Sequence, residues 1–440
     1  MTSVPQPHRS TALHTDHYEL TMLDAALGSG VAARDAVFEV FCRSLPPGRG
    51  FAVVGGTGRL LDAIEAFRFD EERLAWLLDA RVVSADAVAF LRDWHFAGDV
   101  DGYPEGEVFF AHSPILTVHA DFASAVVLET LVLSILNHDS AIASAAARFR
   151  LAAGGKRLLE GGSRRTDDHA AVAAARVAYV AGFDVTSNLE AGFGYGVPTG
   201  GTAAHAFTLA HDDELAAFRA QAARLGPGTT FLVDTFDVAQ GTRNAVAATD
   251  GRLGGVRIDS GDLAAGARTA RAILDAAGCP HATITVSGDL DEHGIAAIEA
   301  SGAPVDAYLA GTKLVTGSGE PTAHLVYKLV AVAERAGPGA YCRPVAKRST
   351  GKDDPGGRKT AWRLLDGTGT ATGEVALVDA AGPPCAGARP LQVPLVRGGA
   401  RVDDGGVREA RARCGASLAE LPAAALGRHA TPPFAVATRA

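Results

Sequence analysis

The fold is indicated most clearly by residues 254–289, which read GGVRIDSGDLAAGARTARAILDAAGCPHATITVSGD. Two short apolar runs, 255–258 and 282–286, each lead into a turn built from Ser, Gly and Asp. The Ala-rich segment between them has the apolar spacing of an amphipathic helix. A strand, a helix and a second strand in this order predict a parallel βα unit, because parallel strands need a long crossover connection.

The same pattern recurs on both sides of this stretch, roughly every 20–30 residues. Seven or so such units without a GxGxxG turn after the first strand favour an α/β barrel over an open, doubly wound sheet, which stays the alternative. The other apolar runs that carry the pattern are KRLLEGGSRR, AGFDVTSN, GTAAHAF, TTFLVDTFD and DAYLAGTKLV.

The rest of the chain follows a different pattern. Residues 1–120 mix amphipathic helices with short alternating strands, which predicts an α+β sandwich domain. We expect the barrel domain to occupy 121–330. Residues 331–440 contain a basic, Gly-rich loop, short strands and a helix near 406–413, and we expect this segment to return to the N-terminal domain.

Composition excludes several classes of protein. The chain has 440 residues, 47% of them apolar, and a net charge of −9, which argues against a nucleic-acid binder. The apolar segment 124–136 is interrupted by Glu129 and too short to span a bilayer, and no signal peptide is evident, so we expect a cytoplasmic protein without membrane contact. The widely spaced cysteines are expected to be reduced: Cys42, Cys279, Cys342, Cys385 and Cys414.

Two Gly-rich turns after neighbouring strands predict a phosphate site. SGDLDEHG spans 287–294 and GTKLVTGSG spans 311–319. Gly lets a backbone approach a ligand, and successive N–H groups bind anions. Barrels often hold phosphate between their last strands, although ordinary βα turns are the alternative. The candidate phosphate-binding residues in these turns are Ser287, Gly288, Gly311, Thr312 and Lys313.

Charged residues follow two other strands. Arg257 and Asp259 point to the same face of their strand, where they suit a charged, hydroxylated ligand or form a structural ion pair. Asp259, with Asp289 after the next strand, is a candidate Mg²⁺ ligand. Arg164 and Arg165 are candidates for binding carboxylate or phosphate, with solvated loop arginines as the alternative.

Three further motifs have simpler alternatives. GTAAHAF places His205 on an apolar strand, where a core histidine is the default interpretation and a nucleophile is the alternative. Asp16 is a candidate N-cap of a helix that carries Tyr18, a core residue by default. Only six of the 41 basic residues are lysines, and the loop 346–359 holds three of them, which predicts a polyphosphate-binding lid or a solvated loop.

Together these motifs resemble the nicotinate phosphoribosyltransferase family over most of the chain, in the order of that family. The resemblance implies a type II phosphoribosyltransferase, with an irregular, incomplete α/β barrel plus an α+β sandwich domain. It also implies a homodimer with shared active sites. The motifs are HTDHYELTM, EGGSRRT, GFDVTSN, GTAAHAF, VDTFD, VRIDSGD, GTKLVTG and KRSTGK with GGRK.

The resemblance implies transfer of phosphoribose from 5-phosphoribosyl 1-pyrophosphate to nicotinate in NAD salvage. It implies coupling to ATP hydrolysis through a phosphohistidine at His205, and a requirement for Mg²⁺. Arg257 and Asp259 join His205 as catalytic residues. The substrate-binding residues are Tyr18, Arg164, Arg165, Asp184, Ser187, Asn188 and Thr202, and Lys347 and Lys352 join the phosphate-binding group.

Two positions depart from the expected pattern. Gly161 stands where family members often carry a bulky apolar residue. Asp184 stands where an acid in related enzymes favours an amide substrate, and a carboxylate would repel nicotinate. A nicotinamide or quinolinate phosphoribosyltransferase, a Schiff-base aldolase using Lys313 and a non-catalytic phosphosugar-binding protein therefore stay as alternatives.

Overall fold

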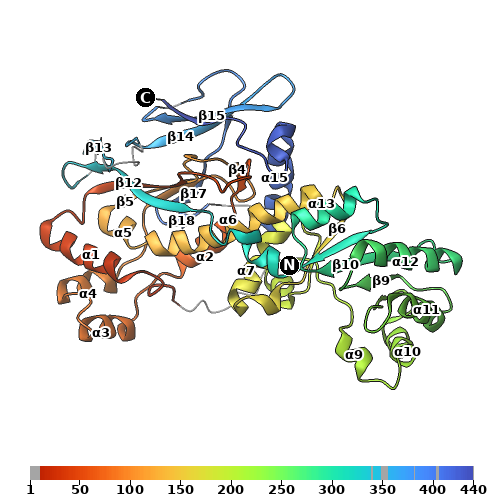
Figure 1. The fold of residues 1–440 in the computed structure, drawn as a ribbon. Coiled ribbons are helices and arrows are strands. Elements are labelled where there is room, and N and C mark those ends of the chain that lie inside the picture. Colours follow the sequence, from red (N-terminus) through yellow and green to blue (C-terminus); the bar gives the residue numbers. More distant parts are fainter. Residues whose placement is uncertain (1–9, 338–339, 348–354, 381, 403–405, 440) are drawn as a thin grey trace. The chain divides into compact units, whose positions relative to one another are not determined.

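The computed structural model describes residues 10–337, 340–347, 355–380, 382–402 and 406–439. They form two compact units. Unit 1 contains Met1–Ser144 and Glu320–Ala440, and unit 2 contains Ala145–Gly319. The ranges 1–120, 121–330 and 331–440 stay a prediction of the domain limits. Figure 1 shows the elements of both units.

Unit 2 is built on a six-stranded sheet in which all neighbouring strands run parallel. The sheet ends at β7 on one side and β8 on the other, so it is a curled half-barrel, which confirms the predicted incomplete α/β barrel. In spatial order its strands are β7 (Val185–Thr186), β6 (Arg157–Glu160), β11 (Ala307–Ala310), β10 (Thr283–Gly288), β9 (Gly255–Ile258) and β8 (Thr230–Leu232).

One predicted strand of this series is wrong. GTAAHAF forms a loop that leads into helix α9 (His205–Leu209), and His205 is the first residue of that helix. The run consists largely of Gly and Ala, which have low preference for strands, so its apolar character alone was misleading.

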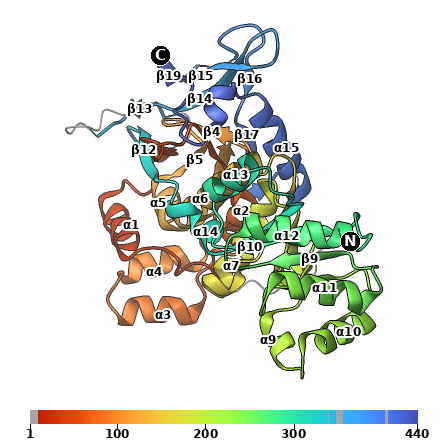
Figure 2. The same cartoon turned by 45° about the vertical axis from the view of Figure 1, so that its right-hand side comes forward.

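The helices of unit 2 begin just after the strand ends. In most of them an Asp or Asn side chain accepts a backbone N–H of the first turn, which supplies one of the hydrogen bonds that a helix start lacks. Helices α10, α11 and α12 lie side by side in chain order (Figure 2). The helices are α7 (Asp168–Val180), α8 (Leu189–Tyr195), α10 (Glu214–Leu225), α11 (Val238–Thr249), α12 (Leu263–Ala276), α13 (Glu292–Ala300) and α14 (Thr312–Val315).

Unit 1 is built around a seven-stranded sheet. Phe38 of β1 stacks on Tyr327 of β12 with ring centroids 4.8 Å apart, and β17 pairs with β3, so segments from both ends of the chain share this sheet. In order its strands are β13 (Cys342–Pro344), β12 (Leu325–Ala333), β1 (Asp35–Cys42), β5 (Leu116–Asp121), β3 (Asp99–Gly102), β17 (Val393–Arg397) and β18 (Ala400–Arg401).

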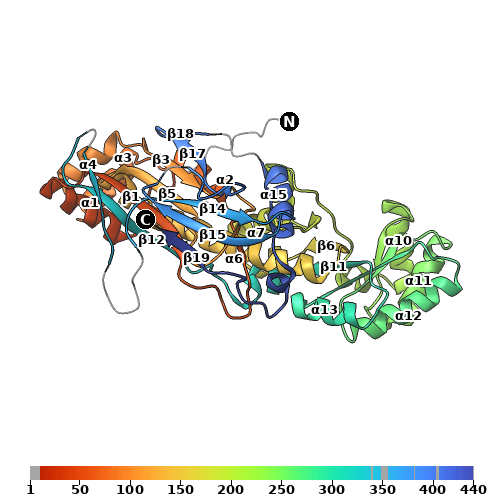
Figure 3. The same cartoon turned by 90° about the horizontal axis from the view of Figure 1, so that it is seen from above.

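Two smaller sheets and several helices complete unit 1, and Figure 3 shows α1, α3 and α4 together beside the large sheet. The small sheets contain β16 (Arg389–Pro390), β14 (Lys359–Leu365), β15 (Ala371–Val378) and β19 (Val436–Arg439), and β2 (Ala52–Val53) with β4 (Val108–Phe109). The helices are α1 (His17–Ser29), α2 (Thr57–Glu65), α3 (Glu71–Asp79), α4 (Ala85–Arg92), α5 (Phe122–Val126) and α15 (Val407–Ala419).

The apolar segment near residue 124 is the start of a long helical stretch. Helix α5 leads into α6 (Glu129–Ala152), and Phe122–Ala152 is long and apolar enough to cross a membrane by length and composition. However, 61% of its most apolar window is buried inside the protein. Such burial is typical of a core helix.

Candidate functional site

Arg257 and Asp259 lie together at the carboxyl end of β9. The Arg257 guanidinium donates a hydrogen bond to Thr202 Oγ1 at 2.8 Å and lies 3.7 Å from the Asp259 carboxylate. Burial lowers the pKa of Arg257 and the neighbouring Arg164 adds to this, while Asp259 and Asp234 oppose it. The structure therefore groups four of the predicted site residues in unit 2: Arg164, Thr202, Arg257 and Asp259.

Asp259 is held in place by neighbouring strands. Ser287, fully buried at the end of β10, donates its hydroxyl hydrogen to Asp259 Oδ1. Asp234, which follows β8, accepts the Asp259 N–H at 2.9 Å and the Ser260 hydroxyl at 2.7 Å. Asp234 Oδ1 is buried and has no hydrogen-bond partner among the residues that the structure describes. Asp234 is absent from the predicted site residues, although its place after an apolar strand was a usable signal.

His205 is oriented by Thr235. Its Nδ1 atom lies 3.1 Å from Thr235 Oγ1, and the ring is partly buried. A hydrogen bond at Nδ1 fixes the ring and directs Nε2 to another partner. This contact is compatible with a nucleophilic Nε2 atom.

The arginine turn, residues 161–165, follows β6. Arg164 and Arg165 are exposed. Asn188 Nδ2 donates to Ser163 Oγ at 3.0 Å, which joins this turn to the exposed Ser187. At the base of the turn Glu160 is 1% exposed, and burial raises the pKa of its carboxyl. Glu160 is absent from the site residues predicted from the sequence, although it is the first residue of the EGGSRRT motif.

The two predicted phosphate turns follow adjacent strands, because β10 pairs with β11. Gly288 has a φ of +132°, which only Gly adopts readily. Gly311 is the N-cap residue directly before α14, and Lys313 is exposed on that helix next to the half-buried Thr312. Their position at the last strands agrees with the phosphate site of barrel enzymes.

Leu309 occupies the space beside Gly161. A Cβ atom added to Gly161 would lie 2.7 Å from Leu309 Cδ2. An apolar side chain from β11 thus stands next to the position where a bulky residue was expected.

Asp184 lies apart from the other candidates of its motif. The residue precedes β7, whereas Ser187 and Asn188 follow this strand. Its carboxylate accepts the Leu158 N–H at 2.9 Å and lies 3.4 Å from Arg150 Nη1. The structure therefore places Asp184 near the amino ends of β6 and β7, whereas Ser187 and Asn188 lie at the carboxyl end of β7.

Two other candidates, Tyr18 and Lys347, belong to unit 1. Tyr18 belongs to α1 of unit 1, is 45% exposed, and has its pKa raised to about 12 by partial burial and the carboxylates near it. Lys347 is exposed, and Lys352 lies outside the described residues.

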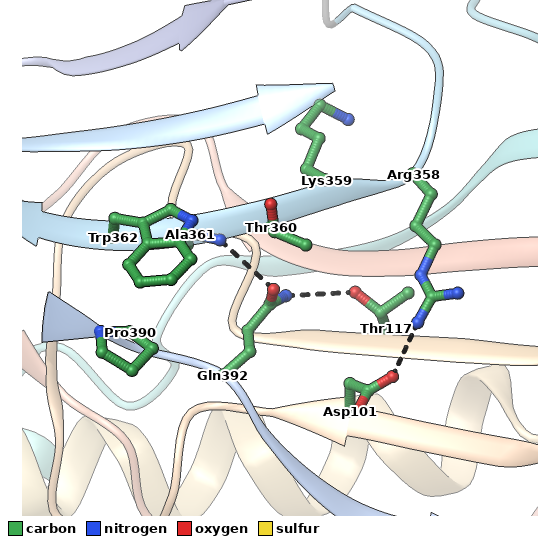
Figure 4. Close-up of a pocket in the computed structure, with 9 residues that line it drawn as sticks. All are labelled: Asp101, Thr117, Arg358, Lys359, Thr360, Ala361, Trp362, Pro390 and Gln392. Carbon is green, nitrogen blue, oxygen red and sulfur yellow. Dashed lines mark hydrogen bonds and ion pairs between the residues drawn. The ribbon is translucent and has the colours of Figure 1, made fainter. Parts of the chain in front are cut away.

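Lys359, the last lysine of the basic loop, differs from the prediction of a polyphosphate-binding residue. Its Nζ atom lies 2.7 Å from Glu39 Oε2, and both side chains are buried. Its neighbour Arg358 pairs with Asp101 at 2.9 Å. Both basic residues line a small pocket of unit 1 (Figure 4). Lys359 is therefore part of a structural ion pair and is not available to a polyphosphate.

Asp259 and Asp289 are the candidate metal ligands at the carboxyl ends of the strands. No group of three or more His, Cys, Asp or Glu side chains that could hold a metal occurs in the described part of the chain. Asp259 and the exposed Asp289 follow adjacent strands. Mg²⁺ is commonly held by one or two carboxylates together with substrate phosphates, so these two residues fit such an ion.

Comparisons with known proteins show which family this chain resembles. Residues 13–137 match a family model described as the nicotinate phosphoribosyltransferase N-terminal domain. A nicotinate phosphoribosyltransferase of Mycobacterium tuberculosis (strain CDC 1551 / Oshkosh) is 54% identical over 430 residues, which cover 95% of this chain and 93% of that protein.

Two solved structures resemble the fold. The crystal structure of human nicotinic acid phosphoribosyltransferase has a TM-score of 0.83 at 26% identity and covers 96% of this chain and 97% of its own. A nicotinate-nucleotide pyrophosphorylase from Pyrococcus furiosus has a TM-score of 0.77 at 22% identity over 96% of this chain and 99% of its own, which shows a shared fold.

Proposed function

The chain belongs to the nicotinate phosphoribosyltransferase family, and from this premise we propose that it joins nicotinate to 5-phosphoribosyl 1-pyrophosphate. The products are nicotinate mononucleotide and pyrophosphate. The observation that carries the proposal is the 54% identity to a nicotinate phosphoribosyltransferase over 95% of this chain. The grouping of anion-binding residues at the strand ends of unit 2 supports it.

The reaction exchanges two bonds at C1 of the ribose. The bond from C1 to the pyrophosphate oxygen breaks, and its electron pair leaves with the pyrophosphate. The lone pair of the pyridine nitrogen forms the new bond. Positive charge develops on the sugar, and the Asp259 carboxylate is the candidate that stabilises it. Ser287 and Asp234 hold Asp259 in position.

Negative charge develops on the leaving pyrophosphate. Arg164, Arg165 and Arg257 are the candidate cations, and Lys313 and Lys347 are candidates at the phosphates. The turns at Gly288 and Gly311 supply backbone N–H groups for the 5′-phosphate. A Mg²⁺ ion on Asp259 and Asp289 would act as a Lewis acid on the phosphate oxygens.

ATP coupling through His205 is part of the proposal. Nε2 attacks the γ-phosphorus of ATP, the bond to the ADP oxygen breaks, and ADP leaves. Water later attacks the phosphohistidine, which releases phosphate and restores the imidazole. The contact between Nδ1 and Thr235 supports this role, because it leaves Nε2 to face a ligand.

Nicotinate is the proposed pyridine, because the exposed Arg164 and Arg165 are candidates for binding its carboxylate. Asp184 no longer opposes this choice, since its carboxylate is bonded to Leu158 and Arg150. Leu309 beside Gly161 is a candidate apolar wall for the ring. We further propose that Tyr18 contacts the pyridine in a homodimer with shared active sites, and that the enzyme is cytoplasmic.

Competition between pyridines tests the proposal. The enzyme is incubated with 5-phosphoribosyl 1-pyrophosphate, Mg²⁺ and equal concentrations of nicotinate, nicotinamide and quinolinate, and the nucleotides are separated. We expect nicotinate mononucleotide to dominate. A dominant product from either of the other pyridines would support the alternative transferases, and phosphosugar binding without pyrophosphate release would support a binding protein.

A further inference from the structure

Glu160 is a buried carboxylate at the carboxyl end of β6, next to the arginine turn. It is 1% exposed. Among the described residues, the Thr186 hydroxyl and the Gly162 N–H donate hydrogen bonds to its carboxylate. Burial raises the pKa of this carboxyl, and among the described residues no Lys or Arg opposes the change. A buried carboxylate without a cation costs stability. Such a residue at the edge of a candidate site is expected to have a functional role.

Glu160 connects two turns through both of its oxygens. Gly162, in the arginine turn, donates its N–H to Oε1. Thr186, at the end of β7, donates its hydroxyl hydrogen to Oε2 at 2.5 Å. Each donor thus has its own oxygen, and both turns are tied to one rigid strand.

The connection closes through Asn188. The Asn188 N–H donates to Thr186 Oγ1 at 3.0 Å, and Asn188 Nδ2 donates to Ser163 Oγ at 3.0 Å. We call Glu160, Thr186, Asn188 and Ser163 the Glu160 clamp. The ring of hydrogen bonds fixes the arginine turn relative to Ser187 and Asn188.

The arginine turn is also fixed on a second side. A Cβ atom added to Gly162 would lie 2.2 Å from Val315 Cγ1 and 3.2 Å from the Gly311 carbonyl oxygen. The turn therefore packs directly against the predicted phosphate turn after β11. A shift of the arginine turn would disturb both neighbouring turns.

We propose that Glu160 is a positioning residue, which holds Arg164 and Arg165 in the geometry that binds the substrate anions. The inference rests on the proposed function, because it assigns these arginines to substrate. Glu160 itself acts through the turns, and its carboxylate form accepts both donors at once.

Two substitutions each break hydrogen bonds of the Glu160 clamp and change the volume of the side chain only slightly. In Glu160→Gln the amide oxygen accepts one donor, but the NH2 group cannot accept the second. In Thr186→Val the hydroxyl is lost. We expect kcat/KM for 5-phosphoribosyl 1-pyrophosphate to fall about 10²-fold, the scale of a displacement of about 1 Å in a site. Thr186→Ser keeps the hydroxyl and should recover most of the activity.

A matched control separates positioning from general destabilisation. Thr242 is fully buried in α11 of the same unit, and its hydroxyl donates to the Val238 carbonyl at 2.7 Å. Thr242→Val should leave KM unchanged. A partly unfolded variant loses active enzyme, which lowers kcat and not KM, whereas a displaced arginine turn raises KM.

Calorimetric titration with Mg²⁺ and pyrophosphate provides a readout that does not require turnover. We expect weaker binding to Glu160→Gln and Thr186→Val than to the wild type and Thr242→Val. Unchanged KM and pyrophosphate affinity in both clamp variants would overturn the inference. If the wild type makes no nicotinate mononucleotide, the proposed function fails, and the titrations alone still decide whether the clamp positions an anion site.

Discussion

Two lysines of the same basic segment have opposite environments. Lys347 is exposed, whereas the Lys359 ammonium is buried against Glu39 and also donates to the Gly357 carbonyl at 3.1 Å. The sequence showed that lysines are concentrated in residues 346–359. It did not show which of these lysines is buried in the folded protein. Burial depends on β14 facing Glu39 of β1, and that contact joins residues far apart in the chain.

Replacing Lys359 tests its structural role. Lys359→Met leaves the Glu39 carboxylate buried without its cation, so the free energy of unfolding should fall by about 3–5 kcal/mol. Urea denaturation measures this change, with Lys347→Met as the exposed control. Equal stability of Lys359→Met and wild type would contradict the buried pair.

The exposed Lys347 has a different predicted role, in binding phosphates. We expect Lys347→Ala to raise KM for 5-phosphoribosyl 1-pyrophosphate or ATP.

His205 allows a test of ATP coupling at a single atom. His205→Ala removes the proposed nucleophile, so acid-labile phosphoprotein should no longer form with γ-labelled ATP, and stimulation of turnover by ATP should disappear. Thr235→Val keeps the imidazole and should reduce labelling only in part, because it removes the contact that orients the ring. Full ATP stimulation in His205→Ala would show that the coupling does not pass through this residue.

Strand direction decides which residues of each element reach the site. The positions of Asp259, Ser287 and Gly311 at the carboxyl ends of strands were predictable, because each lies at the end of an apolar run that forms a strand or directly after it. Asp184 precedes β7, which its proximity to Ser187 and Asn188 in the motif did not show, and its role in substrate binding stays a prediction. His205 was assigned to the wrong element, because its loop of Gly and Ala resembles an apolar strand.

Asp184→Asn tests this placement. The amide oxygen can still accept the Leu158 N–H, and the lost attraction to Arg150 should cost at most about 1 kcal/mol of stability. We expect the ratio of kcat/KM for nicotinate and nicotinamide to stay unchanged. A shift of this ratio towards nicotinamide or nicotinate would show that Asp184 contacts the pyridine.

At the scale of the whole molecule, unit 2 is inserted into unit 1. The chain leaves unit 1 after Ser144 and returns at Glu320. The repeating strand–helix pattern predicted the half-barrel well, because each βα unit is local in sequence. The pairing of β17 with β3 joins distant segments, so the sequence could suggest the return of the chain but not its register.

Complementation tests the proposed shared active sites of the homodimer. Tyr18→Ala and Arg257→Ala should each be nearly inactive. If Tyr18 serves the partner's site, a mixed dimer has one site with both residues intact. Equal mixing after denaturation and refolding should then restore about a quarter of the wild-type activity, since half of the dimers are mixed. Activity that stays at the level of the separate variants would contradict shared sites.

The central claim is that the polar strand ends of unit 2 transfer phosphoribose to nicotinate. The most direct measurement is product analysis after incubation of the wild type and Asp259→Asn with nicotinate, 5-phosphoribosyl 1-pyrophosphate and Mg²⁺, with and without ATP. We predict equal amounts of nicotinate mononucleotide and pyrophosphate from the wild type, and a rate at least about 10²-fold lower in Asp259→Asn. Absence of nicotinate mononucleotide from the wild type under both conditions, or full activity of Asp259→Asn, would contradict the claim.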